Sequence, residues 1–183
     1  MAARVIFDFL DPAAIRAWHS IDDVVMGGRS RSRVGGDAQD GMIFTGTLSL
    51  ENGGGFASIR SVVGRYDLSR ARGVRLILRG DGLRYKFSLR CDSAFDGISY
   101  QASFVTFGDD WQDLALPWAA FVPTYHGRVL TQAPPLNPAD ICSFGLILAD
   151  RQQGPFRLAV RGLLALEGDG DGEQIAAPDP ARG

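Results

Sequence analysis

The chain has 183 residues, of which 45% are hydrophobic and 22% are charged. This length and composition predict one soluble globular domain with a sizeable core. The net charge of −2 argues against nucleic-acid binding driven by counterion release.

Targeting signals and metal-ligand patterns are missing from the sequence. Acidic residues interrupt the apolar run at residues 1–8, so no signal peptide is expected. No stretch approaches the length of a membrane span, and a cytoplasmic location follows as the expectation. His19 and His126 show no metal-ligand spacing with each other or with cysteine, and neither a metal nor a cofactor is predicted. Cys91 and Cys142 are too few for a disulfide framework, so we expect free thiols, with a single disulfide left open.

The first elements are a strand at residues 5–9 and a helical turn at residues 13–18. A segment with unusual composition follows, and it contains Trp18, Asp22, Asp23, Met26, Gly27 and Gly28. Strands at residues 29–34 and 42–50 lead to a second such segment, which contains Glu51, Asn52, Gly54, Gly55 and Arg60. The second segment runs into a strand at residues 56–63.

Two interpretations of these glycine-rich segments are open. Their backbone N–H groups could form a cradle for an anion, or the glycines could make tight turns at strand ends. Anion cradles usually open a helix, whereas strand alternation follows each segment here, which favours turns. The pair Asp22 and Asp23 could be catalytic acids, but side-chain caps of turns are more typical. We expect the two segments to lie close together.

The clearest alternation predicts a half-buried antiparallel hairpin. Residues 74–79 and 84–91 alternate between apolar and polar side chains around a turn at residues 80–82. Tyr85, Phe87 and Leu89 are expected in the core. The opposite face of the hairpin would then gather five basic side chains, from Arg75, Arg79, Arg84, Lys86 and Arg90.

This predicted basic face has two interpretations. Gln101 and Ser103 would extend it if the strand at residues 99–107 lies alongside. Such a face suits a sugar, a carboxylate or an acidic protein surface. Alternatively, it is a solvated face whose arginines pair with acids from elsewhere in the chain.

The last elements carry three further candidate residues. A strand at residues 111–116 ends at Pro117, and its Trp111 is expected in the core. A helical turn at 118–121 follows, with Trp118 expected to be partly exposed. Residues 122–139 predict a long proline-bounded loop, in which His126 and Arg128 are either ligand-binding or simply exposed residues.

Strands at residues 141–149 and 156–166 complete the pattern. The residues from 168 to 183 are polar and rich in proline and glycine, which predicts a disordered tail after a single domain at residues 1–167. Many short strands, glycine turns and little helix predict an all-β fold, a jelly-roll β-sandwich.

Two motifs carry a family resemblance. The run IDDVVMGGRS at residues 21–30, preceded by Trp18, and the run LSLENGGGFASIR at residues 48–60 resemble the thirty-kilodalton complex I intermediate-associated protein family. The resemblance implies a galactose-binding-like jelly roll and a role in assembling the respiratory NADH:ubiquinone oxidoreductase. The sequence lacks the import extension of mitochondrial members and looks like a stand-alone bacterial version. The resemblance brings no catalytic residues.

Three classes of function are open. The first is a non-catalytic binding module with protein partners, such as complex I subunits or assembly intermediates. The alternative is a carbohydrate-binding module, because the jelly roll often hosts that function. An enzyme is disfavoured, because the sequence shows no nucleophile–base pattern and no dinucleotide fingerprint.

Overall fold

The computed structural model describes residues 3–94, 96–168 and 174–175, and it is built almost entirely of strands. The strands are β1 Val5–Asp8, β2 Trp18–Ser20, β3 Arg31–Asp37, β4 Gly41–Leu48, β5 Ala57–Ser61, β6 Gly73–Arg79, β7 Arg84–Arg90, β8 Ser99–Val105, β9 Trp111–Pro117, β10 Val122–Tyr125, β11 Arg128–Val129, β12 Ser143–Leu148, β13 Gly154–Leu166 and β14 Gln174–Ile175. The helical segments are α1 Pro12–Arg16, η1 Asp23–Met26, η2 Glu51–Gly53, η3 Trp118–Ala120 and η4 Pro138–Asp140.

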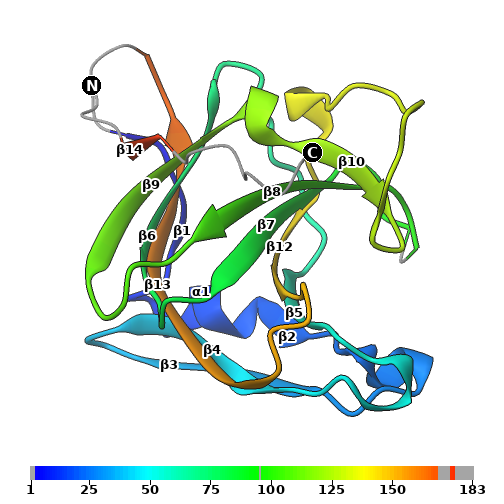
Figure 1. The fold of residues 1–183 in the computed structure, drawn as a ribbon. Coiled ribbons are helices and arrows are strands. Elements are labelled where there is room, and N and C mark those ends of the chain that lie inside the picture. Colours follow the sequence, from blue (N-terminus) through cyan, green and yellow to red (C-terminus); the bar gives the residue numbers. More distant parts are fainter. Residues whose placement is uncertain (1–2, 95, 169–173, 176–183) are drawn as a thin grey trace.

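Two seven-stranded sheets pack face to face and confirm the predicted sandwich (Figure 1). Sheet A has the order β14-β9-β6-β13-β4-β3, with β1 paired to β13. Sheet B has the order β11-β10-β8-β7-β12-β5-β2. Neighbouring strands are antiparallel except β14, which runs parallel to β9. Sequential strands repeatedly change sheet, which is characteristic of jelly rolls.

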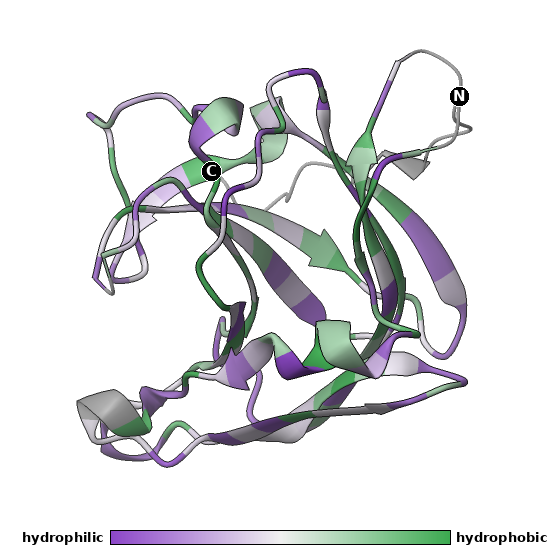
Figure 2. Ribbon diagram, turned by 180° about the vertical axis from the view of Figure 1, so that it is seen from behind, coloured by the Kyte–Doolittle hydropathy of each residue, from purple (hydrophilic) through white to green (hydrophobic). Residues whose placement is uncertain are grey.

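The core lies between the sheets and follows the alternation of the strands. Tyr85, Phe87 and Leu89 are fully buried, as predicted, while their neighbours on β7 point away from the core. Figure 2 shows hydrophilic and hydrophobic bands alternating along the strands. Aromatic rings from both sheets meet in the middle, where Phe7 of β1 lies edge-on to Phe144 of β12 at a centroid distance of 6.1 Å. Trp18 packs edge-on against Phe7 at 5.7 Å.

The predicted hairpin of residues 74–91 is wrong in its pairing, although its alternation is right. β6 pairs with β13 and β9 in sheet A, whereas β7 pairs with β8 and β12 in sheet B. The connection at residues 80–83 therefore carries the chain from one sheet to the other. Alternation reports which face of a strand is buried and not which strand lies beside it.

The ordered loop predicted at residues 122–139 contains two short strands. Residues 122–129 form β10 and β11, a short hairpin that extends sheet B beside β8. Pro123 lies near the edge of sheet B. A proline, which has no backbone N–H to donate to the ladder, is tolerated at such a position. The helical turns predicted near residues 13–18 and 118–121 are present as α1 and η3. Asp11 caps α1 by accepting a hydrogen bond from the Ala13 backbone N–H.

The predicted disordered tail lies mostly outside the described residues. Of residues 168–183, the structure describes Gly168 and the two residues of β14. No helix in the described ranges is long and apolar enough to cross a membrane.

Candidate functional site

The two glycine-rich segments meet at Asp23, and their predicted proximity is confirmed. The Asp23 side chain is almost fully buried and accepts hydrogen bonds from the backbone N–H of Ser30 at 2.9 Å, of Gly55 at 2.8 Å and of Phe56 at 3.3 Å. The Ser30 hydroxyl donates a fourth at 2.6 Å. We call this arrangement the Asp23 junction.

The glycines make room for this carboxylate. A Cβ added at Gly54 would lie 2.6 Å from Asp23 Oδ2, and one added at Gly28 would lie 2.4 Å from Oδ1. Gly55, with φ +146°, adopts a backbone conformation that other residues rarely adopt. The glycine-rich segments therefore form both tight turns and an anion cradle. The anion that their backbone N–H groups bind is the carboxylate of the chain's own Asp23.

The hydrogen bonds determine the protonation of Asp23. Burial raises the pKa of this carboxyl group, but the bonds from Ser30, Gly55 and Phe56 outweigh burial and leave the pKa below its ordinary value. The group is therefore ionised in the folded protein at neutral pH.

Asp22 ties the same segments to β3 and β5. Its carboxylate accepts hydrogen bonds from the Ser32 hydroxyl at 2.6 Å and from the Ser32 and Ser58 backbone N–H groups at 2.7 and 3.2 Å. Both aspartates thus hold turns, which is the interpretation that the sequence favoured.

The other residues of the two motifs play separate parts. Gly27 ends η1 in the left-handed conformation, and Asn52 has a positive φ within η2. Glu51 forms an exposed ion pair with Arg29 at 3.2 Å. The Met26 side chain lies outside the part of the structure that is described.

The predicted basic face is divided between two sheets. Arg75 and Arg79 lie on the outer face of sheet A, whereas Arg84, Lys86 and Arg90 lie on the outer face of sheet B. The two groups point in opposite directions and cannot form one surface. Arg75 forms an ion pair with Asp113, its Nε lying 2.5 Å from Oδ1.

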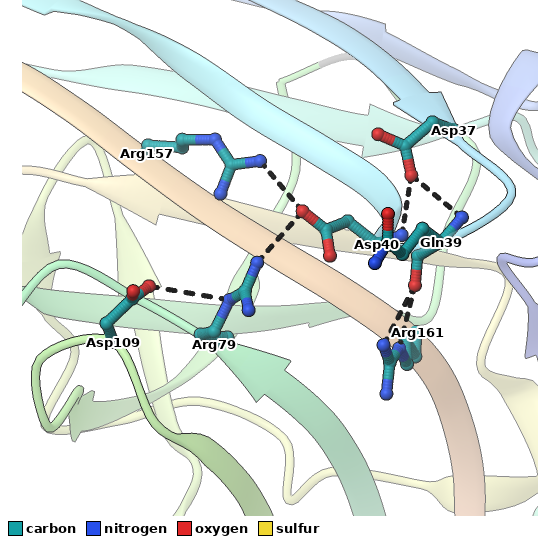
Figure 3. A network of polar contacts seen from close by, with 7 residues as sticks. All are labelled: Asp37, Gln39, Asp40, Arg79, Asp109, Arg157 and Arg161. Atoms are coloured by element: carbon teal, nitrogen blue, oxygen red, sulfur yellow. Dashed lines mark hydrogen bonds and ion pairs between the residues drawn. The ribbon is translucent and has the colours of Figure 1, made fainter.

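Arg79 belongs to an ion-pair network on sheet A (Figure 3). Asp40 Oδ2 lies 2.9 Å from Arg79 Nη2 and 3.1 Å from Arg157 Nη2, and thereby bridges two strands. Asp109 approaches Arg79 Nε at 3.5 Å from the loop between β8 and β9. Arg161 donates two hydrogen bonds to the Gln39 carbonyl oxygen, at 3.1 and 2.9 Å. The turn between β3 and β4 is thus fastened to the sheet.

Trp111 does not lie in the core, contrary to expectation. It is partly exposed on the outer face of sheet A, opposite Arg79 in the ladder of β6 and β9. The guanidinium carbon of Arg161 lies 3.9 Å from the centroid of its ring, and that of Arg79 lies 4.9 Å away. An indole face attracts such cations, so the network covers the ring. Its arginines are engaged within the chain, as the alternative interpretation expected.

The network gives a stability prediction. Replacing Asp40 with alanine is expected to lower the free energy of unfolding by about 1–3 kcal/mol, because Arg79 and Arg157 lose charge-assisted hydrogen bonds. A urea melt measures the change. Asp109→Ala is the matched control, because this side chain is 92% exposed, and we expect about 0.5 kcal/mol or less. Equal losses from the two variants would contradict the bridging role of Asp40.

The outer face of sheet B is the candidate functional site. β8 lies beside β7, as the extension of the polar face required, so Gln101 is opposite Ser88 and Ser103 is opposite Lys86. β12 and β5 continue the sheet on the other side of β7, and Arg60 joins the same face opposite Gly145.

Polar side chains on this face are held by contacts within the chain. Ser88 is 8% exposed and Ser143 2% exposed, although both point away from the core. Lys86 Nζ forms an ion pair with Asp150 at 3.0 Å. Arg90 Nη1 donates to the Ala94 carbonyl oxygen at 3.2 Å.

The sequence pattern did not reveal Arg60 and Ser143 as members of this face. Alternation along residues 57–61 could have placed Arg60 on an outer face. Only the pairing of β5 and β7 with β12 shows that Arg60 and Arg90 share one face.

The predicted loop residues lie at the β11 edge of sheet B. His126 Nε2 lies 2.7 Å from Asp96 Oδ1, and the Tyr125 hydroxyl donates to Asp96 at 3.2 Å. Arg128 is exposed on β11. Trp118 is half-buried at the start of η3 and donates its indole N–H to the Ala71 carbonyl oxygen at 2.8 Å, which places it away from sheet B's outer face.

The cysteines and other potential metal ligands form no metal cluster in the described ranges. Cys91 and Cys142 are free and partly buried, and burial raises the pKa of both thiols. No group of three or more His, Cys, Asp or Glu residues in the described part of the chain could hold a metal ion.

Comparison with known sequences gives one family. The family model of Complex I intermediate-associated protein 30 matches residues 7–160. The mitochondrial protein of that name from Mus musculus is 28% identical over 179 residues, which cover 86% of this chain and 54% of the mouse protein. The chain therefore spans about half of the mouse relative. An uncharacterized protein of Schizosaccharomyces pombe is 26% identical over 81% of this chain and 80% of its own length.

Comparison with solved structures gives the same fold. The family 11 carbohydrate-binding module of a cellulosomal cellulase of Clostridium thermocellum superposes with a TM-score of 0.66 at 17% identity, covering 93% of this chain and 99% of the module. An agarase superposes with a TM-score of 0.61 at 11% identity, covering 93% of this chain and 25% of the enzyme. At these identities the likeness concerns the fold alone.

Proposed function

Because this chain belongs to the Complex I intermediate-associated protein 30 family, we propose that it is a non-catalytic binding module that acts in the assembly of respiratory complex I. The name of the mouse relative supports association with complex I intermediates. The proposed partners are complex I subunits or their assembly intermediates, and the protein acts on them as a chaperone-like factor.

We assign partner binding to the outer face of sheet B. This assignment is carried by the mixed composition of that face. Its cations also make contacts within the chain, as Lys86 does with Asp150 and Arg90 does with the Ala94 carbonyl oxygen. On sheet B, basic, hydroxyl and amide side chains from β5, β7 and β8 share one surface. A mixed surface of this kind suits reversible binding of a polar partner.

Charge reversal at Arg84 and Arg90 tests this assignment. The double variant Arg84→Glu/Arg90→Glu is expected to capture less partner in affinity purification from the native cell, followed by mass spectrometry. Wild-type capture of NADH dehydrogenase subunits is expected to weaken as salt rises, because exposed charges are screened over about 8 Å at physiological ionic strength.

The matched control reverses two exposed arginines of β3 on the other sheet, Arg31→Glu/Arg33→Glu. It is expected to leave capture unchanged. Thermal melting of each variant establishes that it is folded, because Arg90 is partly buried and donates to the Ala94 carbonyl oxygen. Full capture by the sheet B variant at low salt would contradict the assignment and direct attention to residues 125–128. Failure of the wild type to recover any complex I protein would contradict the proposed role itself.

A carbohydrate-binding module is the second candidate function, and the fold shared with the family 11 module favours it. Hydroxyl and amide groups on sheet B, from Ser88, Gln101 and Ser103, could hydrogen-bond to sugar hydroxyls. Binding on a glycan array that is lost in Gln101→Ala would support this candidate, and an array without binding would remove it.

A further inference from the structure

The centre of the outer face of sheet B combines two arginines with a bare strip of backbone. Arg60 on β5 lies opposite Gly145 on β12, and Gly145 lies opposite Ser88 on β7. Arg90 lies opposite Ser143, two residues along the same β12. The two arginines therefore flank β12 on neighbouring strands, Arg60 directly opposite Gly145 and Arg90 on the diagonal, where Arg90 Nη1 also donates to the Ala94 carbonyl oxygen.

A side chain at Gly145 would crowd the Ser88 hydroxyl group. A Cβ added at Gly145 would lie 2.4 Å from the Ser88 hydroxyl oxygen and 3.1 Å from the Ile59 carbonyl oxygen. Ser88 and Ser143 line the strip and are nearly buried. Gln101 extends the same line of residues on β8. Small residues therefore form the surface at the centre of the face. The longer side chains of Arg60 and Arg90 lie on the strands to either side.

The charges of the two arginines interact. Burial is the main cause that lowers the pKa of Arg60 to about 10, and the positive charge of Arg90 is the second. Burial also lowers the pKa of Arg90, while Asp92 and Asp96 act in the opposite direction. Both guanidinium groups remain charged at neutral pH. An anion placed between them would relieve their repulsion and would gain from their partial desolvation.

We infer that Arg60 and Arg90 form a carboxylate-binding site over Gly145, which receives an acidic side chain of the protein partner. The guanidinium fork fits a planar carboxylate with two parallel hydrogen bonds, which a lysine cannot reproduce. The small floor at Gly145 lets the carboxylate approach the sheet. The inference rests on the proposed function, because it names the chemistry by which the same face recognises its partner.

Binding of a polyanionic peptide by the purified full chain tests the site. The probe is fluorescently labelled poly-L-glutamate, followed by anisotropy at physiological ionic strength. Arg60→Gln is expected to weaken binding about tenfold or more, as loss of a charge-assisted hydrogen bond predicts. Arg60→Lys keeps the charge but not the fork, and is expected to weaken binding severalfold.

The matched control is Arg31→Gln/Arg33→Gln, which removes two arginine charges from β3. It is expected to change the affinity less than about twofold, since exposed charges are screened over about 8 Å at physiological ionic strength. Thermal melting of each variant establishes that it is folded. If Arg60→Gln is unfolded, Arg60→Lys and Arg90→Lys carry the test.

Three outcomes would overturn the inference. They are equal affinity in Arg60→Gln and the wild type, equal weakening by the β3 control, and binding of inorganic phosphate without binding of poly-L-glutamate. The test uses no cellular partner, so its failure is distinct from failure of the proposed function. A site that binds poly-L-glutamate in a protein that captures no complex I subunit would leave the carboxylate site standing and remove the assembly role.

Discussion

Replacing Asp23 with alanine is expected to lower the free energy of unfolding by more than about 3 kcal/mol. The carboxylate accepts four hydrogen bonds, three of them from backbone N–H groups of Ser30, Gly55 and Phe56. Each buried donor left without an acceptor costs about 1–3 kcal/mol. Two segments far apart in sequence would lose their common anchor at once. Urea denaturation followed by tryptophan fluorescence measures the loss.

Glu51→Gln is the control for this experiment, because Glu51 lies in the same pair of segments. Its ion pair with Arg29 is exposed, with side-chain exposures of 62% and 65%, and exposed pairs contribute about 0–1 kcal/mol. Comparable losses from Asp23→Ala and Glu51→Gln would contradict the junction as the anchor.

The pH dependence of stability gives the Asp23 experiment a second readout. The pKa of Asp23 is lowered in the folded state, so its stabilising contribution is present above the unfolded pKa of about 3.9. That contribution is lost as pH falls through the folded pKa. Stability of the wild type should therefore fall below about pH 4. Asp23→Asn should lose less stability over the same range.

Replacing Phe87 with alanine is expected to cost about 3–5 kcal/mol, the range for large aromatic truncations in a core. The ring is fully buried and stacks on Phe144, with Phe121 at a centroid distance of 6.4 Å. These three residues come from β7, β12 and the segment before β10, so the cavity would lie among separate parts of the chain. Thermal and urea melts measure the change.

Lys86→Ala is the control, since Lys86 is the neighbour of Phe87 on the same strand and faces outward. Its ion pair with Asp150 is partly exposed, and we expect a loss of about 1 kcal/mol or less. A loss at Lys86 equal to that at Phe87 would mean that the two faces of β7 are assigned the wrong way round.

The candidate site was only partly predictable, and the hairpin error shows why. Alternation placed Arg84, Lys86 and Arg90 on the outer side of β7 correctly, because the period of a strand is fixed by its own backbone. It also placed Arg75 and Arg79 on the outer side of β6. The error was to join the two strands, since a short glycine turn can close a hairpin or cross between sheets.

Trp111 shows a second limit. A tryptophan on an amphipathic strand is usually buried by the core, and the residue pattern of β9 favoured that interpretation. Here the ring is covered from the outside by Arg79 and Arg161. Those arginines lie on β6 and β13, so their meeting over one ring depends on the order of strands in sheet A.

By itself the sequence determined the all-β class, the buried face of most strands, and the meeting of the two glycine-rich segments that also carry the family resemblance. These features depend on local backbone geometry or on short motifs. Each of the two can be recognised from residues that are neighbours in the sequence. Only the tertiary structure decided which sheet each strand joins, and therefore that Arg60 and Arg90 share a face from which Arg75 and Arg79 are excluded. Strand partners in a sandwich are chosen by packing between residues far apart in the chain, and no local period encodes that choice.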